Sequence, residues 1–489
     1  MRRGAVVFLG VVLLAGCGSS HPAPPPTTTT TQQAKAKGKQ RACRIEVSQL
    51  VVTILDGNTL QRVAGAHVRI QRKRGVTGKH GVVVLKGQRR RLAVEVSRRG
   101  YTSVRARLDF ARRHQTIRIY QPRLQWPIYG ATPGRTQAQT AIKLRPPFHL
   151  VWSTSMGHLI EFPAVVWDGT AYVGNQRSVV RAISMRSGKV SWTHRTPGSP
   201  RMASSPAVWG DDLVYHTMGG TVYLLNRATG KVLWSWDAGA AIEPSPVIRH
   251  GLDYFGTAGG EVVALDLRKH RVRWSHSLGA KITSSVALAG RRLFIGDYAG
   301  RLWALSPTNG ATRWVGQVNG KIYGTPAVSQ RRVFVPSSDG DSLTAFSTSG
   351  RYLWRDSTSN YVYSSPAVWH GRVFFGSYNG DFYAASAATG RILWRVYTGG
   401  PISGAVVAVD GIAYAGSFSH HIVGVSIRTG RRVLNFRHGE YVPVSGDGAH
   451  LLLHGFNRIY AVEPRHKRAR HAHHRKRHRR HHKTPKTPC

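Results

Sequence analysis

The feature that most constrains the fold is a short word that recurs about every 40 residues and ends in tryptophan. Four of its copies read "RSGKVSW", "RATGKVLW", "TSGRYLW" and "AATGRILW". The tryptophans stand in register at Trp152, Trp192, Trp234, Trp274, Trp314, Trp354 and Trp394, and Asn435 holds the eighth position. A word repeated this often marks a repeated structural element rather than one active site. Its period is typical of a β-propeller.

Each repeat unit contains the same series of strands and turns. One unit reads "SSPAVWHGRVFFGSYNGDFYAASAATGRILW", in which apolar runs are separated by turns at His370 and Gly371, Asn379 and Gly380, and Thr389 and Gly390. Four short strands joined by tight glycine-containing turns form one propeller blade. A second anchor, such as "SSPAV" at Ser204 and Ser364, keeps the same period, and together the two words count eight units.

The ends of the repeat region predict that the ring closes. The last unit, "YVPVSGDGAHLLLHGFNRIYAVEP", supplies three strands, whereas the strand "PFHLVW" at residues 147–152 precedes the first unit. Pairing of these two segments leaves no open sheet edge. The sequence therefore predicts an eight-bladed propeller over residues 147–464.

The seven tryptophans are expected to seal the blades. A large ring on an outer strand can lie against the neighbouring blade while its indole N–H donates to a backbone carbonyl. The Thr-Gly or Ser-Gly before it permits a tight turn. This structural role accounts for the repetition without a cofactor.

The words "A-x-x-x-x-T/S-G-x-x-x-W", "S-S-P-A-V-x-x-G" and "Y-x-G-x-x-x-G-x-x-Y-A" resemble the PQQ-type β-propeller repeat, and the resemblance covers all eight units. Proteins with this repeat include quinoprotein alcohol and glucose dehydrogenases and the outer-membrane assembly lipoprotein BamB. The resemblance therefore implies either a binding scaffold or an enzyme, because one fold hosts both.

The enzymatic alternative is a PQQ- and Ca²⁺-dependent quinoprotein dehydrogenase. The resemblance implies that such an enzyme needs oxygen ligands around Ca²⁺, an aspartate as general base and a ring stacked on the quinone. Acids are few over the repeats and stand singly in different units, and no adjacent cysteine pair is present. We therefore expect no catalytic residue, no cofactor and no metal site; a site at His420, His421 and His454 is a weaker alternative.

The N-terminus resembles a bacterial lipoprotein signal. Arg2 and Arg3 precede an apolar run, and "LAGC" at residues 14–17 resembles a lipobox. The resemblance implies that residues 1–17 form the signal peptide, that Cys17 carries a lipid, and that the protein is anchored on the extracytoplasmic face of the envelope. A Pro/Thr-rich tether follows over residues 18–43. Cys43 and Cys489 either pair or remain free thiols.

Residues 44–122 contain short alternating runs such as "LVVTILD", "AHVRIQR" and "QTIRIY", which predict a small β-sandwich. The words "GAHVRI", "GKHGVVVL" and "RRGYTSV" resemble the carboxypeptidase regulatory-like family, which implies an immunoglobulin-like sandwich acting as a spacer. Residues 123–146 are expected to be a connector. The sequence thus predicts an all-β chain.

The C-terminal segment, residues 465–489, contains 11 Lys and Arg, seven His and no acid. This composition predicts a disordered polycation that contacts anionic surfaces. The whole chain carries a formal charge of +48, which favours acidic partners.

The loops that run from the outer strand of one blade to the inner strand of the next are expected to form a binding face, together with the turns between second and third strands. A mixture of charges and tyrosines suits a protein or an envelope polymer. We expect a monomeric, non-enzymatic scaffold or sensor. The candidate residues are Glu161, Arg201, Glu243, Lys281, Lys321, Tyr323, Tyr361, Tyr363, Glu440 and Tyr441.

Overall fold

The structure, a computed structural model, describes residues 47–88 and 91–465. The predicted signal peptide with Cys17, the tether, the Cys43 and Cys489 pair and the basic tail beyond Arg465 lie outside these residues. Within them, no helix is long and apolar enough to cross a membrane. All described regular structure is β-strand apart from one short 3₁₀ helix, η1 (Pro122–Leu124).

The N-terminal part of the described chain is a two-layered β-sandwich. One sheet has the order β4-β1-β7 and the other β3-β2-β5-β6. Alternate residues of β1, Leu50, Val52 and Ile54, face a core shared with Val68 and Val96 of the second sheet. The strands are β1 (Val47–Asp56), β2 (His67–Ile70), β3 (Lys73–Val76), β4 (Val82–Gln88), β5 (Arg91–Ser97), β6 (Val104–Asp109) and β7 (His114–Ile119).

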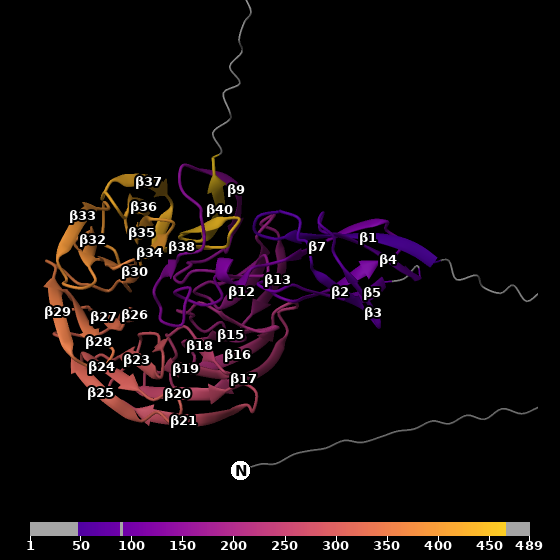
Figure 1. Cartoon of the computed structure of the whole chain (residues 1–489). Helices are drawn as coiled ribbons and strands as arrows, with labels where there is room; N and C mark the ends of the chain where they lie inside the picture. The colour runs from indigo at the N-terminus through magenta and orange to yellow at the C-terminus, as the bar shows by residue number, and fades with distance from the viewer. Residues whose placement is uncertain (1–46, 89–90, 466–489) are drawn as a thin grey trace, which may run out of the picture. The chain divides into compact units, whose positions relative to one another are not determined.

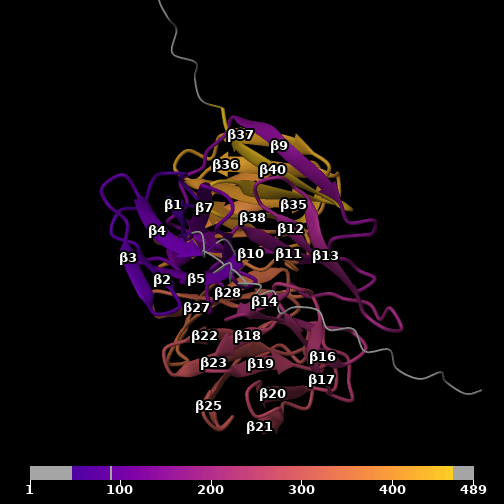
Figure 2. The same ribbon diagram turned by 90° about the vertical axis from the view of Figure 1, so that its right-hand side faces the viewer.

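Residues 138–464 fold as a β-propeller. Over this fully described range the strands form eight antiparallel sheets, one of which also takes up the short strand β8 (Ala138–Gln139). Figure 1 shows the sheets following one another around a ring, and Figure 2 shows β10, β11, β12 and β13 of one sheet side by side.

Every sheet has an inner, a second, a third and an outer strand. The inner strands are β10 (Val165–Trp167), β14 (Ala207–Trp209), β18 (Val247–Arg249), β22 (Ala287–Ala289), β26 (Ala327–Ser329), β30 (Ala367–Trp369), β34 (Val407–Val409) and β38 (Gly439–Gly446). The second strands are β11 (Thr170–Gly174), β15 (Asp212–His216), β19 (Leu252–Gly256), β23 (Arg292–Gly296), β27 (Arg332–Ser337), β31 (Arg372–Gly376), β35 (Ile412–Ser417) and β39 (Leu451–Gly455).

The third and outer strands complete the sheets. The third strands are β12 (Val179–Ser184), β16 (Thr221–Asn226), β20 (Glu261–Asp266), β24 (Arg301–Leu305), β28 (Ser342–Ser347), β32 (Asp381–Ser386), β36 (His421–Ser426) and β40 (Arg458–Pro464). The outer strands are β13 (Val190–Arg195), β17 (Val232–Asp237), β21 (Arg271–Ser277), β25 (Thr312–Gln317), β29 (Tyr352–Ser357), β33 (Ile392–Tyr397), β37 (Arg432–Arg437) and, from before the first unit, β9 (Phe148–Ser155).

The ring closes as the ends of the repeat region predict. Strand β9 pairs antiparallel with β40, so the N-terminal strand is the outer strand of the last sheet. At the centre, the inner strand β38 of that sheet contacts β10 of the first. Closure leaves the repeat without the exposed edge that an open array would have.

The repeated tryptophans lie between adjacent sheets. Six of them donate the indole N–H to a backbone carbonyl in the turn of the next sheet, over 2.7–3.3 Å. Trp152 of β9, for example, donates to Met185 O, and Trp394 donates to Ile427 O. In the third unit His270 replaces the glycine of the word, and its ring stacks on Trp234 with centroids 4.5 Å apart.

Candidate functional site

A cavity of about 50 Å³ lies at the centre of the ring, and we call it the central cavity. The loops between sheets bring Glu161, Glu243, Tyr323 and Tyr363 to its wall, whereas Tyr441, expected in such a loop, reaches it from the inner strand β38. These five candidate residues come from five different sheet junctions and lie far apart in the chain. The remaining wall residues are small, hydroxyl-bearing or apolar: Tyr129, Phe162, Ala203, Thr283, Ser285, Gly324, Thr325, Ser365, Ser403, Gly404, Ala405 and Val442.

A belt of hydroxyl groups links five successive junctions between sheets. The backbone N–H of Ser205 donates to Ser245 Oγ, that of Ser245 to Ser285 Oγ, that of Ser285 to Thr325 Oγ1 and that of Thr325 to Ser365 Oγ. The four donor–acceptor distances are 2.9–3.0 Å, and each bond joins residues 40 positions apart. The belt satisfies buried N–H groups at the point where neighbouring sheets meet.

The segment that the sequence suggested as a connector, residues 123–146, crosses the centre of the propeller. Its carbonyl oxygens accept bonds from the inner strands, for example from Leu288 N–H to Pro133 O and from Val328 N–H to Gly134 O. Strand β8 then pairs in parallel with β34. The connector therefore packs among the inner strands, which sequence reasoning did not foresee because its Pro- and Gly-containing sequence carries no repeat word.

Arg135 is the fully buried centre of this segment. Its guanidinium donates 2.6–2.9 Å bonds to the carbonyl oxygens of Tyr129, Ser245, Pro246 and Val286. Burial lowers the pKa of Arg135 to about 10, which leaves it charged at neutral pH. Next to it, Tyr129 Oη donates to Ser365 Oγ over 3.1 Å and joins the segment to the hydroxyl belt.

The two acids of the central cavity differ in their partners. Glu243 Oε1 lies 3.1 Å from Lys281 Nζ, which makes an ion pair at the rim. Glu161 is half-buried, and among the described residues no side chain forms a hydrogen bond or an ion pair with it. Burial raises the pKa of the Glu161 carboxyl. The positive charge of Arg201 lowers this pKa, and the negative charge of Glu243 raises it further.

Tyrosines surround these acids, and their phenols stay protonated. Burial, followed by the negative charges of Glu161 and Glu243, raises the pKa of Tyr323. Burial and the charges of Glu440 and Glu161 raise the pKa of Tyr441 to about 12. The cavity therefore presents neutral phenols and two carboxyl groups.

Six aromatic rings form a continuous series along one side of the mouth, and we call it the aromatic arc. Successive centroids lie 4.9–5.9 Å apart, mostly in edge-to-face contacts. Tyr361 is 43% exposed, whereas the other members are partly buried. The members are Tyr323, Tyr361, Tyr363, Tyr378, Phe418 and Tyr441.

The other candidate residues lie outside the central cavity. Arg201 is exposed. Lys321 is also exposed and pairs with Asp339 over 3.2 Å. Glu440 is buried and pairs with His420 over 3.5 Å, so its carboxylate is less accessible than the sequence suggested.

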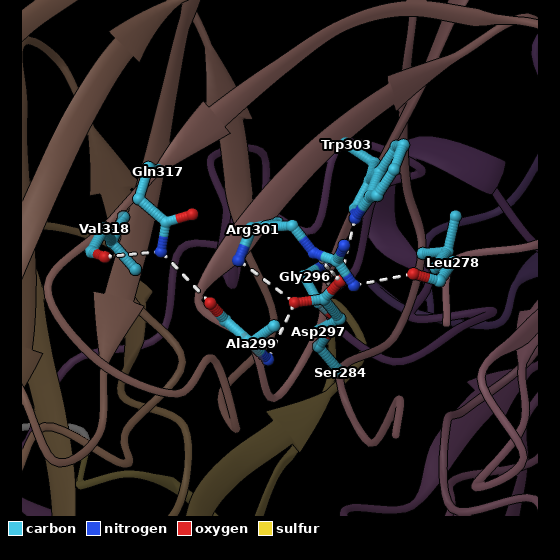
Figure 3. Close-up of polar contacts among 9 residues, drawn as sticks. All are labelled: Leu278, Ser284, Gly296, Asp297, Ala299, Arg301, Trp303, Gln317 and Val318. Atoms are coloured by element: carbon cyan, nitrogen blue, oxygen red, sulfur yellow. Dashed lines mark hydrogen bonds and ion pairs between the residues drawn. The ribbon is translucent and has the colours of Figure 1, made fainter. Parts of the chain in front are cut away.

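Asp297 lies in the turn between the second strand β23 and the third strand β24. Figure 3 shows that hydrogen bonds within the protein occupy its carboxylate. Its carboxylate accepts from Arg301 Nε over 2.8 Å and Trp303 Nε1 over 2.9 Å, besides the backbone N–H groups of Ala299 and Arg301. Arg301 Nη2 in turn donates to Leu278 O. This fully bonded carboxylate holds its turn and is not free to bind a ligand.

Among the residues that the structure describes, no group of three His, Cys, Asp or Glu is arranged to hold a metal ion. The three histidines weighed as ligands have separate partners: His420 pairs with Glu440, His421 Nδ1 with Asn435 Oδ1, and His454 is buried beside Ala164. The structure does not bring them together.

Sequence reasoning missed a buried pair between two second strands. His216 Nε2 lies 2.8 Å from Asp253 Oδ2, and His216 Nδ1 lies 2.8 Å from Pro244 O. In the repeat register, His216 replaces a glycine such as Gly256, and Asp253 replaces an apolar residue such as Leu213. His216 and Asp253 depart from the repeat in adjacent units. Comparing those two units could have indicated the pair from the sequence.

The repeat region matches a known family. The sequence profile described as outer membrane protein assembly factor BamB matches residues 149–282, 258–368 and 342–469. The quinoprotein ethanol dehydrogenase of Pseudomonas aeruginosa is 33% identical over 111 residues, which are 20% of this chain and 17% of that protein. The chain thus spans only 17% of the length of this curated relative.

Solved structures share the fold. BamB from Moraxella catarrhalis superimposes with a TM-score of 0.56 at 17% identity, over 66% of this chain and 99% of that one. The quinohemoprotein alcohol dehydrogenase from Comamonas testosteroni gives a TM-score of 0.61 at 13% identity, over 70% of this chain and 81% of that one. At such identities the likeness concerns the fold alone.

Proposed function

Because the chain belongs to the outer membrane protein assembly factor BamB family, we propose that it is an extracytoplasmic, non-enzymatic scaffold that binds a segment of another protein at the mouth of its propeller. We count each of the eight sheets as one blade and interpret the N-terminal sandwich as an immunoglobulin-like spacer. In this proposal Cys17 carries the lipid that anchors the protein, which acts as a monomer.

The aromatic arc is the observation that carries the proposal. Tyrosines contribute large contact areas at low entropic cost and dominate many protein interfaces. Around the arc, the ion pairs of Lys281 with Glu243 and of Lys321 with Asp339 form a polar rim. An apolar centre with a charged rim is the usual anatomy of a protein-binding surface.

A matched pair of variants tests this proposal. Tyr361 lies in the arc, whereas Tyr352 is 54% exposed on the outer strand β29. Photo-crosslinking from each position in intact envelopes should give a defined adduct from 361 and none from 352. Tyr361→Ser should reduce recovery of that partner by about tenfold or more, and Tyr352→Ser should not. Equal behaviour of the two positions would refute the proposal.

The partial identity to quinoprotein ethanol dehydrogenases favours one alternative, a PQQ- and Ca²⁺-dependent dehydrogenase. The residues at the centre do not fit that cofactor pair. A cavity of about 50 Å³ is far below the roughly 300 Å³ of small-molecule pockets. Of the described residues in its wall, the carboxylates are Glu161 and Glu243, and Glu243 is already paired with Lys281, which leaves a single free carboxylate for a hard cation.

The alternative has a direct test. Purified protein is mixed with PQQ and Ca²⁺, and the quinone absorption and alcohol- or sugar-dependent dye reduction are recorded. We expect neither to change beyond a protein-free control. A saturable spectral change with dye reduction would establish the enzymatic function instead.

A further inference from the structure

The central cavity differs in charge from the protein that surrounds it. The chain carries a formal charge of +48, but none of the described residues lining the cavity is basic, and two of them, Glu161 and Glu243, are acids. Lys281 neutralises Glu243. Among the described residues, no cation is bonded to the half-buried Glu161, and Arg201, whose charge acts on it, is exposed and lies outside the cavity.

The rim already shows how this face binds an ammonium group. Lys281 Nζ lies 3.1 Å from Glu243 Oε1 and 5.2 Å from the centroid of the Tyr298 ring. One carboxylate and one aromatic ring thus bind the same ammonium, through charge and through the ring's quadrupole.

The central cavity has the same two components without the ammonium. Glu161 supplies the carboxylate, and the rings of Tyr323, Tyr363 and Tyr441 line the same cavity. Tyr323 and Tyr363 pack edge to face, with centroids 5.4 Å apart and an interplanar angle of 85°, so the wall offers both ring faces and ring edges. Aromatic walls around a carboxylate are suited to a desolvated cation.

The small size of the cavity favours a compact cation. Its volume of about 50 Å³ is far below the roughly 300 Å³ of ordinary small-molecule pockets. Of the common side-chain cations the primary ammonium is the more compact, because a guanidinium is a rigid planar fork. Hydroxyl groups of Thr283, Ser285 and Ser403 in the wall can accept the remaining N–H bonds.

We propose that the central cavity binds the ammonium group of a lysine side chain that the partner segment inserts, with Glu161 as its counter-ion and the rings of Tyr323, Tyr363 and Tyr441 as its walls. This inference rests on the proposed function, since it names the anchor of the bound segment. The aromatic arc holds the segment itself, and the cavity fixes its register.

Calorimetric titration of the full chain tests the inference with two probes. N-acetyl-lysine methylamide carries the ammonium, and N-acetyl-norleucine methylamide has the same four-carbon stem without it. The lysine probe should bind at least about tenfold more tightly, because only it pairs with Glu161. Equal affinities, or no binding of either probe, would overturn the proposal.

Glu161→Gln removes the negative charge with little change in shape. It should lower the affinity for the lysine probe by about tenfold or more. Glu261→Gln is the matched control, because Glu261 is exposed and does not line the cavity. Unchanged binding in Glu161→Gln, or an equal loss in both variants, contradicts the inference. Arg201→Gln removes the cation that, among the described residues, acts on Glu161, so it should strengthen binding of the lysine probe by about twofold.

A second wall variant is available if Glu161→Gln folds poorly. Tyr363→Leu keeps an apolar wall but removes the aromatic ring. It should lower the affinity for the lysine probe by about threefold to tenfold and leave the affinity for the norleucine probe unchanged. Equal effects on both probes contradict a cation–π role. If the crosslink from position 361 is retained but the lysine probe does not bind, only this inference fails. If the probe binds but no crosslink forms, the proposed function fails.

Discussion

Gly390 lies directly against the tryptophan of the neighbouring blade. A Cβ atom added to Gly390 would stand 2.9 Å from Cδ2 of Trp354, closer than carbon atoms approach in proteins. The same relation joins Gly188 to Trp152 and Gly430 to Trp394. The glycine of the repeated word is therefore required for two reasons, its positive φ of 80° and the indole that covers it.

These two requirements can be separated by experiment. Gly371 has nearly the same φ, 78°, but a Cβ there meets nothing within 4 Å. We expect Gly371→Ala to lower the free energy of unfolding by about 1 kcal/mol, from the backbone alone. Gly390→Ala should cost about 3 kcal/mol, because the methyl group also displaces Trp354. Denaturation midpoints measured by tryptophan fluorescence report both values, and equal losses would contradict the sealing role.

The hydroxyl belt predicts a cost for removing one acceptor. In Ser285→Ala the backbone N–H of Ser245 loses its partner inside the protein, so the free energy of unfolding should fall by about 1–2 kcal/mol. Ser275→Ala is the control, because Ser275 is exposed on β21 and its loss should cost less than about 0.5 kcal/mol. Urea unfolding of the two variants beside the wild type gives the difference. A neutral Ser285→Ala would show that the belt is replaceable by water.

The repeat explains why so much of the propeller could be predicted from sequence. The tryptophan and glycine words recur because each blade presents the same surface to the next, and so they give the strand order and the closing strand β9. The loop residues Glu161 and Tyr363 could be named as members of one face, since every unit turns at the same point. The register reveals this geometry directly.

The repeat could not predict contacts that a single unit or segment makes. Arg135 lies in a segment without repeat words, and its four carbonyl partners come from backbone atoms, which leave no trace in residue identity. The His216–Asp253 pair needs two departures from the repeat to be read together. Within the described part of the chain Glu161, and not Glu243, lacks an ion-pair partner, and this depends on where Lys281 points.

We expect replacement of Arg135, the buried residue of the connector, to lower stability strongly. In Arg135→Ala the carbonyl oxygens of Ser245, Pro246 and Val286 lose their buried donors and a cavity opens, so the free energy of unfolding should fall by about 3–5 kcal/mol. Arg135→Lys should recover less than half of this loss, since an ammonium lacks the planar fork. Arg123→Ala, an exposed change in the same segment, is the control. Limited proteolysis of the connector should accelerate only in the Arg135 variants.

A buried histidine predicts how stability depends on pH. Burial lowers the pKa of His454 to about 4, and its Nε2 accepts the backbone N–H of Ala164 over 3.1 Å, which only the neutral ring can do. In the unfolded chain a histidine has a pKa near 6.5. Between these values the unfolded state binds a proton that the native state does not, so stability falls as the pH falls from about 6.5 to about 4, by up to about 3 kcal/mol.

Asp447 acts in the opposite direction, because burial raises its pKa to about 6 and its stabilising contribution is lost as the pH rises toward that value. The difference between wild type and His454→Gln cancels this contribution. The glutamine keeps an acceptor for Ala164 but does not titrate, so the stability of the wild type relative to the variant should decline between pH 7 and pH 4. His158→Gln, an exposed change, should give a flat difference. A flat difference for His454→Gln as well would show that the native protein takes up the proton at this site.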